Sequence, residues 1–159
     1  GYATPSFIKW VNTSAEEDVK KFFINEIRFY NEIESAPILA KQINARSPEI
    51  RSEIIRALGT LKYKEIEPKL FEMYNTQPED VKQNIIAAVL ELGTGNAVDF
   101  LKNAYEEADN WSTKRSILKA LYGYNEAGRQ MFDVLETQAN AHTAILFAHT
   151  KDLLINQIS

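Results

Sequence analysis

The apolar residues of this chain recur with helical spacing, and the spacing itself repeats along the sequence. Between residues 47 and 74 they form two runs, each gathered on one side of a 3.6-residue helix. The first run consists of Ile50, Ile54, Ile55, Leu58 and Leu61, and the second of Ile66, Leu70, Met73 and Tyr74. The pattern predicts two short helices joined by a turn near Gly59.

The same pattern returns every 31 or 32 residues. Ile50 and Ile54 have counterparts in Val19 and Phe23, in Val81 and Ile85, and in Thr113 and Ile117. We therefore expect an all-α chain with helices near residues 15–31, 36–45, 48–61, 66–75, 78–92, 97–108, 112–124 and 127–139. A single hairpin of this length buries too little apolar surface to fold alone, so the hairpins must stack.

Two segments fall outside the period. Residues 1–13 carry Phe7, Ile8, Trp10 and Val11, too many apolar side chains for a solvated linker. We expect this segment to pack on the first repeat or to link it to upstream repeats. Residues 14–139 form the repeat array, which opens with a capping box. In residues 140–159 we expect a closing helix and an apolar tail that folds back or docks on another molecule.

Two stretches carry a family resemblance: PEIRSEIIRALG at residues 48–59 and PEDVKQNIIAAVLELG at residues 78–93. With the period near 31, they resemble HEAT repeats over about residues 15–139. The resemblance implies a right-handed α-solenoid of about four HEAT-like hairpins. The stretch PSFIKW before the repeats is similar to the soluble C-terminal region of bacterial membrane-anchored HEAT proteins. That similarity implies an upstream anchor and a cytoplasmic location.

Composition narrows the possible partners. The 159 residues carry a formal net charge of −4, which argues against non-specific binding of nucleic acid. The chain has no cysteine, so disulfides, thiolate metal sites and cysteine nucleophiles are excluded. No run of 18 apolar residues is present, so the sequence predicts no membrane span.

A ladder of basic residues is the most function-like feature. Equivalent positions are occupied by Lys20, Arg51, Lys82 and Lys114. Lys21 and Arg115 flank the outermost two, and Arg56 and Lys119 follow one turn later. The HEAT resemblance implies that this helix lines the concave side, where the cations form a stripe that binds an acidic peptide, a phosphorylated segment or an anionic headgroup. Trp111 is a candidate apolar anchor. In the alternative, structural interpretation, the cations pair with acidic residues of neighbouring repeats, namely Glu17, Asp18, Glu49, Glu79 and Asp80.

No other motif predicts chemistry. His142 and His149 are seven residues apart, whereas metal ligands on a helix favour separations of three or four. The Gly93–Asn96 stretch lacks the ending of a phosphate loop. We expect no catalytic, cofactor or metal site. The predicted function is a non-catalytic scaffold that binds an acidic protein or peptide. The alternative is a HEAT-like protein that binds or modifies nucleic acid, which the acidic balance disfavours.

Overall fold

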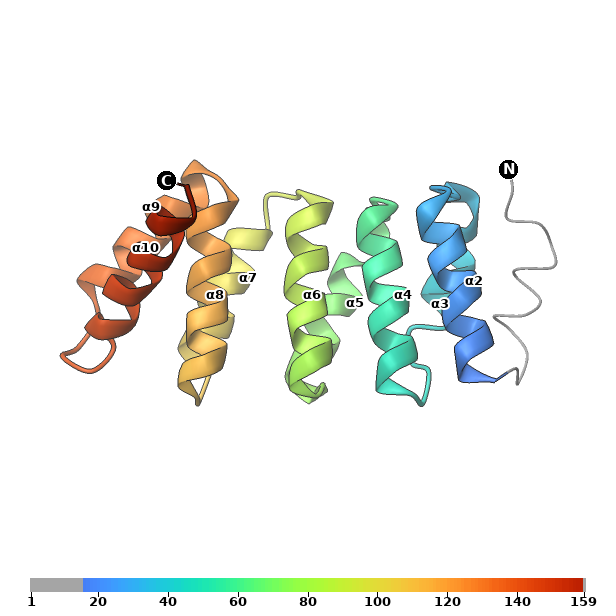
Figure 1. The fold of residues 1–159 in the computed structure, drawn as a ribbon, viewed down its shortest axis with the longest axis horizontal. Helices are drawn as coiled ribbons and strands as arrows, with labels where there is room; N and C mark the ends of the chain where they lie inside the picture. The colour runs from blue at the N-terminus through green and yellow to red at the C-terminus, as the bar shows by residue number, and fades with distance from the viewer. Residues whose placement is uncertain (1–15, 159) are drawn as a thin grey trace. The chain divides into compact units, whose positions relative to one another are not determined.

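The computed structural model describes residues 16–158. These residues divide between Thr94 and Gly95 into two compact units, and each unit is described by itself. Every regular element in this part of the chain is a helix (Figure 1). The predicted fold class, all-α hairpins of the solenoid type, is confirmed.

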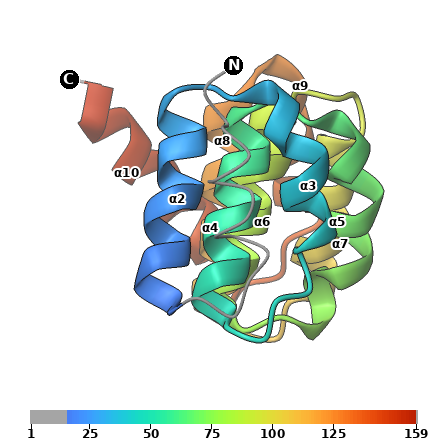
Figure 2. The same cartoon turned by 90° about the vertical axis from the view of Figure 1, so that its right-hand side faces the viewer.

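The first unit stacks helical hairpins side by side. Helix α4 packs against α2 on one side and against α6 on the other, while α3 and α5 pack on α4 and α6 (Figure 2). The elements are α2 (Glu17–Phe29), η1 (Ile33–Ser35), α3 (Ala36–Lys41), α4 (Pro48–Thr60), η2 (Lys64–Ile66), α5 (Glu67–Met73), η3 (Tyr74–Thr76) and α6 (Glu79–Leu92). The predicted helices are all present, with α3 ending four residues earlier than expected.

Local sequence explains where α4 begins. The Ser47 side chain accepts a hydrogen bond from the backbone N–H of Ile50 at 3.3 Å, and Pro48 occupies the first turn. The apolar positions Ile50, Ile54 and Leu58 are buried, as their helical spacing predicts. The start and the buried face of this helix therefore follow from its own residues.

The expected turn near Gly59 is present at Leu61 and Lys62, but the glycine does not form it. Helix α4 continues through Thr60, and the residue with left-handed backbone is Lys62, with a φ of 58°. Gly59 serves instead for close packing, because a Cβ atom added there would lie 3.0 Å from both Cα and Cβ of Ala88. The missing side chain lets α4 and α6 approach closely.

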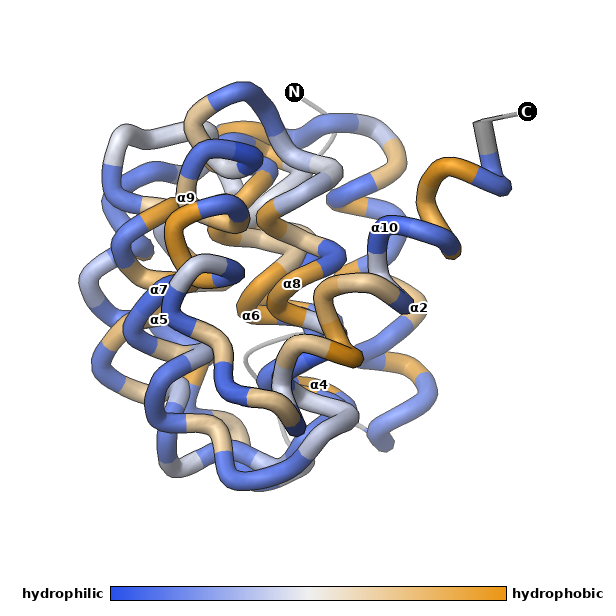
Figure 3. The backbone as a smooth tube through the Cα atoms, turned by 90° about the vertical axis from the view of Figure 1, so that its left-hand side faces the viewer, coloured by the Kyte–Doolittle hydropathy of each residue, from blue (hydrophilic) through white to orange (hydrophobic). Residues whose placement is uncertain are grey.

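The second unit is built around α8. Helices α7 and α10 pack on it, and α9 packs on both α7 and α8. The bounds are α7 (Ala97–Glu107), α8 (Trp111–Tyr124), α9 (Glu126–Thr137) and α10 (Ala144–Ile158). Figure 3 shows polar and hydrophobic positions interspersed along α10.

Aromatic rings join the helices of this unit. The Phe147 ring of α10 makes edge contacts with Phe132 of α9 and Tyr105 of α7, at centroid distances of 5.1 and 5.9 Å. Lys151 Nζ donates to Glu136 Oε1 at 2.7 Å, which also ties α10 to α9. The beginning and middle of α10 are therefore part of the core of this unit, although Ile145 and Ile155 remain exposed.

The expected capping box, residues 14–17, is wrong, because α2 begins at Glu17 and its N-cap is Glu16, which makes no side-chain cap. Two other parts of the sequence interpretation are not tested by these elements. Residues 1–13 lie outside the described residues. The division into an N-terminal segment, a repeat array over 14–139 and a C-terminal cap stays a prediction. Within residues 16–158, no helix is long and apolar enough to cross a membrane.

Candidate functional site

The predicted basic ladder does not form one uniform surface. In the first unit, Arg51 of α4 turns back toward the chain that precedes its own helix. Its Nη1 donates to the carbonyl oxygens of Ala45 and Arg46 at 2.7 and 2.9 Å, and its Nε donates to Gln77 Oε1 at 2.9 Å. Because the guanidinium is engaged on two sides, it holds a connection between helices in place.

The counterparts of Arg51 behave in the same way. The ammonium of Lys82 lies 5.3 Å from the centre of the Tyr74 ring, in the segment just before α6. In the second unit, Lys114 Nζ lies 4.2 Å from the Tyr105 ring and donates to the Tyr105 carbonyl at 2.9 Å. Lys82 and Lys114 thus contact the helical segment that precedes their own helix, whereas Arg51 binds the loop before its own helix. These contacts are structural, but none of them is with the acidic residues that the structural interpretation of the ladder names.

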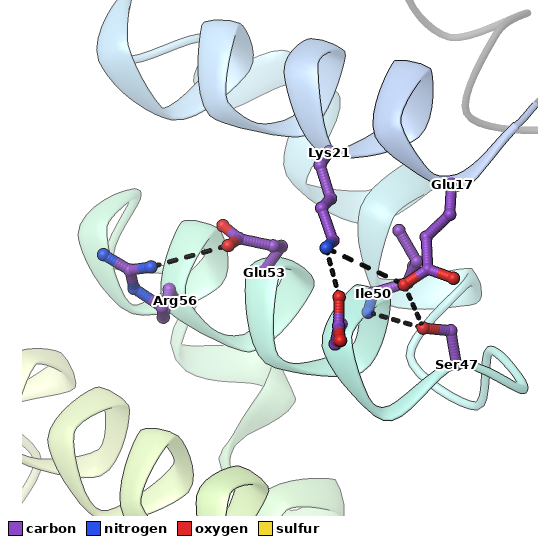
Figure 4. Close-up of polar contacts among 7 residues, drawn as sticks. Glu17, Lys21, Ser47, Ile50, Glu53 and Arg56 are labelled. Carbon is purple, nitrogen blue, oxygen red and sulfur yellow. Dashed lines mark hydrogen bonds and ion pairs between the residues drawn. The ribbon is translucent and has the colours of Figure 1, made fainter.

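The first member of the ladder is placed differently. Lys20 of α2 is half-buried and lines a surface depression of about 300 Å³ with Glu17, Ala45, Arg46, Ser47 and Ile50. Its neighbour Lys21, which points toward α4 in Figure 4, forms an ion pair with Glu49 of that helix. Glu49, which the sequence interpretation paired with a ladder residue, is therefore paired with Lys21, one position after the ladder residue Lys20.

The α2–α4 contact is a small polar network around Lys21. Lys21 Nζ lies 3.8 Å from Glu17 Oε1, and Ser47 Oγ donates to the same carboxylate oxygen at 2.7 Å. Hydrogen bonding from Lys21, reinforced by its charge, lowers the pKa of the Glu49 carboxyl. The same hydrogen bond raises the pKa of Lys21. The groups are solvent-exposed, so the network orients two helices more than it stabilises them.

On α8 the ladder residue Lys114 is half-buried, whereas the next residue, Arg115, is exposed. A step of one residue turns a helix by about 100°, so the flanking residue points elsewhere. This exposed face of α8 carries Trp111, Arg115 and Lys119, spaced one turn apart and all exposed. The structure brings these three predicted residues together.

The two cations of this face have no acidic partner among the described residues. Arg115 and Lys119 make no hydrogen bond or ion pair there, and half of the Trp111 surface is exposed. The N-cap Asn110, whose side chain accepts a hydrogen bond from the Thr113 N–H at 2.8 Å, holds the first turn of α8 and therefore the backbone of Trp111. We define Trp111, Arg115 and Lys119 as the α8 face.

The matching faces of α4 and α6 are less basic. The counterparts of Arg115 are Ser52 and Gln83, and those of Lys119 are Arg56 and Ala87. Of these four residues only Arg56 is charged, and it forms an ion pair with Glu53 at 3.5 Å. Unengaged positive charge at these positions is therefore concentrated on α8.

The described residues show no group of three or more histidines, cysteines or carboxylates that could hold a metal ion. His142 and His149 are both exposed. Among titratable groups in the core of the second unit, Tyr105 has a raised pKa because burial disfavours its charged form. This tyrosine packs against Phe147 and Lys114, so the shift has a structural cause.

Sequence reasoning missed one apolar surface. Phe22 and Phe29 of α2 are 57% and 79% exposed. The available signal was their position in the repeat, because their counterparts in α4 are the polar residues Glu53 and Thr60. Two phenylalanines at positions that are polar in the next repeat indicate that this surface of α2 contacts something apolar.

Comparison with known proteins supports the repeat assignment. A family model described as HEAT repeats matches residues 36–122, more than half of the 159-residue chain. No curated protein matches the chain.

Proposed function

Because this chain belongs to the HEAT repeat family, whose members commonly serve as protein-interaction scaffolds, we propose that it is a non-catalytic scaffold for an acidic protein segment. The segment docks on the α8 face. This helix is the first of its hairpin, the one that in HEAT arrays usually lines the concave side. The finding that carries the proposal is the set of an exposed tryptophan and two unpaired cations one turn apart.

The chemistry of the α8 face fits a peptide with carboxylates and one apolar side chain. Tryptophan and arginine are the residues most often found at the energetic centre of protein interfaces. Trp111 offers a broad apolar surface, while Arg115 offers a planar fork of donors that matches a carboxylate. Lys119 extends the positive potential by one turn and favours encounter with an acidic partner.

A protein partner is favoured over nucleic acid by the number of available charges. Affinity for DNA comes largely from phosphate contacts, about 6–10 of them in tight complexes. The α8 face has two cations, and the whole chain has a net charge of −4. A binding site of this size suits a few carboxylates.

The test uses peptides selected on the immobilised chain from a random library of acidic sequences. Trp111→Ala should weaken binding of the selected peptides by about thirtyfold, the effect of losing an anchor worth about 2 kcal/mol. Arg115→Glu with Lys119→Glu should reduce the association rate and its dependence on salt.

The matched control is Lys41→Glu with Lys64→Glu, which makes the same charge change at exposed positions of α3 and η2. This control should bind the peptides as the unmodified chain does. If the control loses binding equally, only net charge matters. If Trp111→Ala binds normally, the α8 face is not the site. Retardation of a short DNA duplex at physiological salt would contradict the choice of a protein partner.

A further inference from the structure

Helix α2 presents an apolar surface that the rest of the described chain leaves uncovered. Phe22, Phe29, Tyr30 and the nearby Ile33 are all more than half exposed. Val19, Phe22 and Phe23 line an open, almost wholly apolar depression of about 460 Å³, with Asp18 beside them. We call Val19, Phe22, Phe23 and Tyr30 the α2 face.

Comparison with the next repeat explains why this apolar surface is exposed. Val19, Phe23 and Tyr30 are the counterparts of Ile50, Ile54 and Leu61, which are buried in α4. Tyr30 is 54% exposed, whereas Leu61 is 4% exposed. Helix α4 has α2 beside it, but α2 is the first helix of the described residues (Figure 1). Three of the four residues of the α2 face are therefore at core-type positions, and the fourth, Phe22, stands where α4 has the polar Glu53.

Such a surface needs a cover. Large exposed apolar patches are uncommon on isolated soluble proteins, and solenoids require a cap on their terminal repeats. The rings of the first unit already pair among themselves, with Phe22 edge-on to Phe23 at 5.3 Å and Phe29 edge-on to Tyr30 at 5.1 Å. Beside these contacts, Phe22, Phe29 and Tyr30 are still more than half exposed.

We propose that the segment Phe7–Val11 of the same chain covers the α2 face. Four of its five residues are apolar, and the fifth, Lys9, has an acidic counterpart in Asp18 at the edge of the depression. The proposal concerns the end of the first unit and does not depend on the function assigned to the α8 face.

Chain length makes this segment the favoured occupant. Only residues 12–16 separate Val11 from the start of α2 at Glu17. A linker of five residues spans at most about 17 Å, and the 13-residue α2 is about 20 Å long. The segment therefore reaches the level of Phe22 without leaving the first repeat. A short tether also gives it an effective concentration in the millimolar range, which a separate molecule rarely matches.

Tryptophan fluorescence tests the proposal directly. The chain has two tryptophans, Trp10 and Trp111, so Trp111→Phe leaves Trp10 as the only reporter. In the full chain carrying this substitution, the emission should be shifted to the blue of free indole, and iodide should quench it weakly. Adding Phe22→Asp should return both signals to the solvent values while circular dichroism keeps its helical shape.

Two controls distinguish the occupant. Val134→Asp, at an exposed apolar position of α9, should leave the Trp10 signals unchanged. The blue shift should also be independent of protein concentration, because the contact is within one chain. If Trp10 emits as free indole, the proposal is wrong. If its blue shift grows with concentration, a second copy covers the surface and the proposal is equally wrong. Should Phe22→Asp unfold the chain, Val19→Asp in the same depression and the concentration series decide the matter.

Discussion

Gly128 is the position where one added methyl group should do the most damage. It lies in the first turn of α9, where this helix meets α8, and it is buried. A Cβ atom there would lie 2.3 Å from the carbonyl oxygen of Leu121 and 3.2 Å from its carbonyl carbon. An ordinary carbon–oxygen contact is about 3.3–3.6 Å, so the helices would have to separate by about 1 Å. The obstacle is backbone, which cannot rotate away as a side chain can.

The expected cost follows from two opposing terms. Overpacking of a well-filled contact costs about 1–3 kcal/mol, and a backbone obstacle belongs at the upper end. Replacing glycine by alanine within a helix returns up to about 1 kcal/mol. Gly128→Ala should therefore lower the free energy of unfolding by about 2 kcal/mol. For a chain of this length, that corresponds to a fall in Tm of about 4–8 °C.

Gly123 is the matched control. It lies in α8 of the same unit, and an added Cβ atom would meet nothing within 4 Å. Gly123→Ala should therefore be neutral or raise the free energy of unfolding by about 0.5 kcal/mol, because only the backbone entropy term remains. Urea and thermal unfolding followed by circular dichroism would measure both variants. If Gly128→Ala is as stable as the unsubstituted chain, the close approach of α8 and α9 is refuted.

Three further predictions concern contacts between helices. Lys21→Met should raise the pKa of Glu49 toward its ordinary value in an NMR titration. In the unsubstituted chain, the ion pair contributes its full stability above the ordinary carboxyl pKa, and this contribution is lost as the pH falls through the lowered pKa of Glu49. An unchanged titration would dismiss the ion pair. Phe147→Ala should lower the free energy of unfolding by about 3–5 kcal/mol in urea, since its ring is fully buried against Phe132. A loss below about 1 kcal/mol would mean that α10 is not part of the core. Arg51→Met should lower the free energy of unfolding by about 1–3 kcal/mol in calorimetry, because it removes two hydrogen bonds to backbone carbonyl groups. Binding of acidic peptides should not change. Weakened binding would show that Arg51 also contacts the peptide.

The positions of the helices could be predicted from local sequence. The apolar period, the Ser47 cap and the proline in the first turn of α4 all act within a few residues of one another. Their effect is the same whatever the neighbouring helix is. The repeat of 31 or 32 residues extended this reasoning to the other hairpins, because equivalent hairpins bury equivalent apolar positions against their neighbours.

The roles of individual side chains could not be predicted in this way. The sequence placed Arg51, Lys114, Arg115 and Lys119 in one basic stripe. In the structure, the first two bind backbone carbonyl groups of the chain that precedes their own helices, and the last two remain exposed. A difference of one residue, about 100° around the helix, separates an anchor from a free cation. Periodicity records which residues share a face but not which carbonyl or ring lies opposite that face.

Glycine and phenylalanine show the same division. Gly59 and Gly128 lie within helices, and their absent side chains matter because Ala88 and the Leu121 carbonyl stand opposite them. The exposure of Phe22 likewise depends on which elements flank α2. Helix formation depends on backbone and side-chain interactions between residues close in the sequence, so helices can be predicted from the sequence. Contacts across the stack depend on pairs far apart in the chain, so their partners emerge only when the helices are placed side by side.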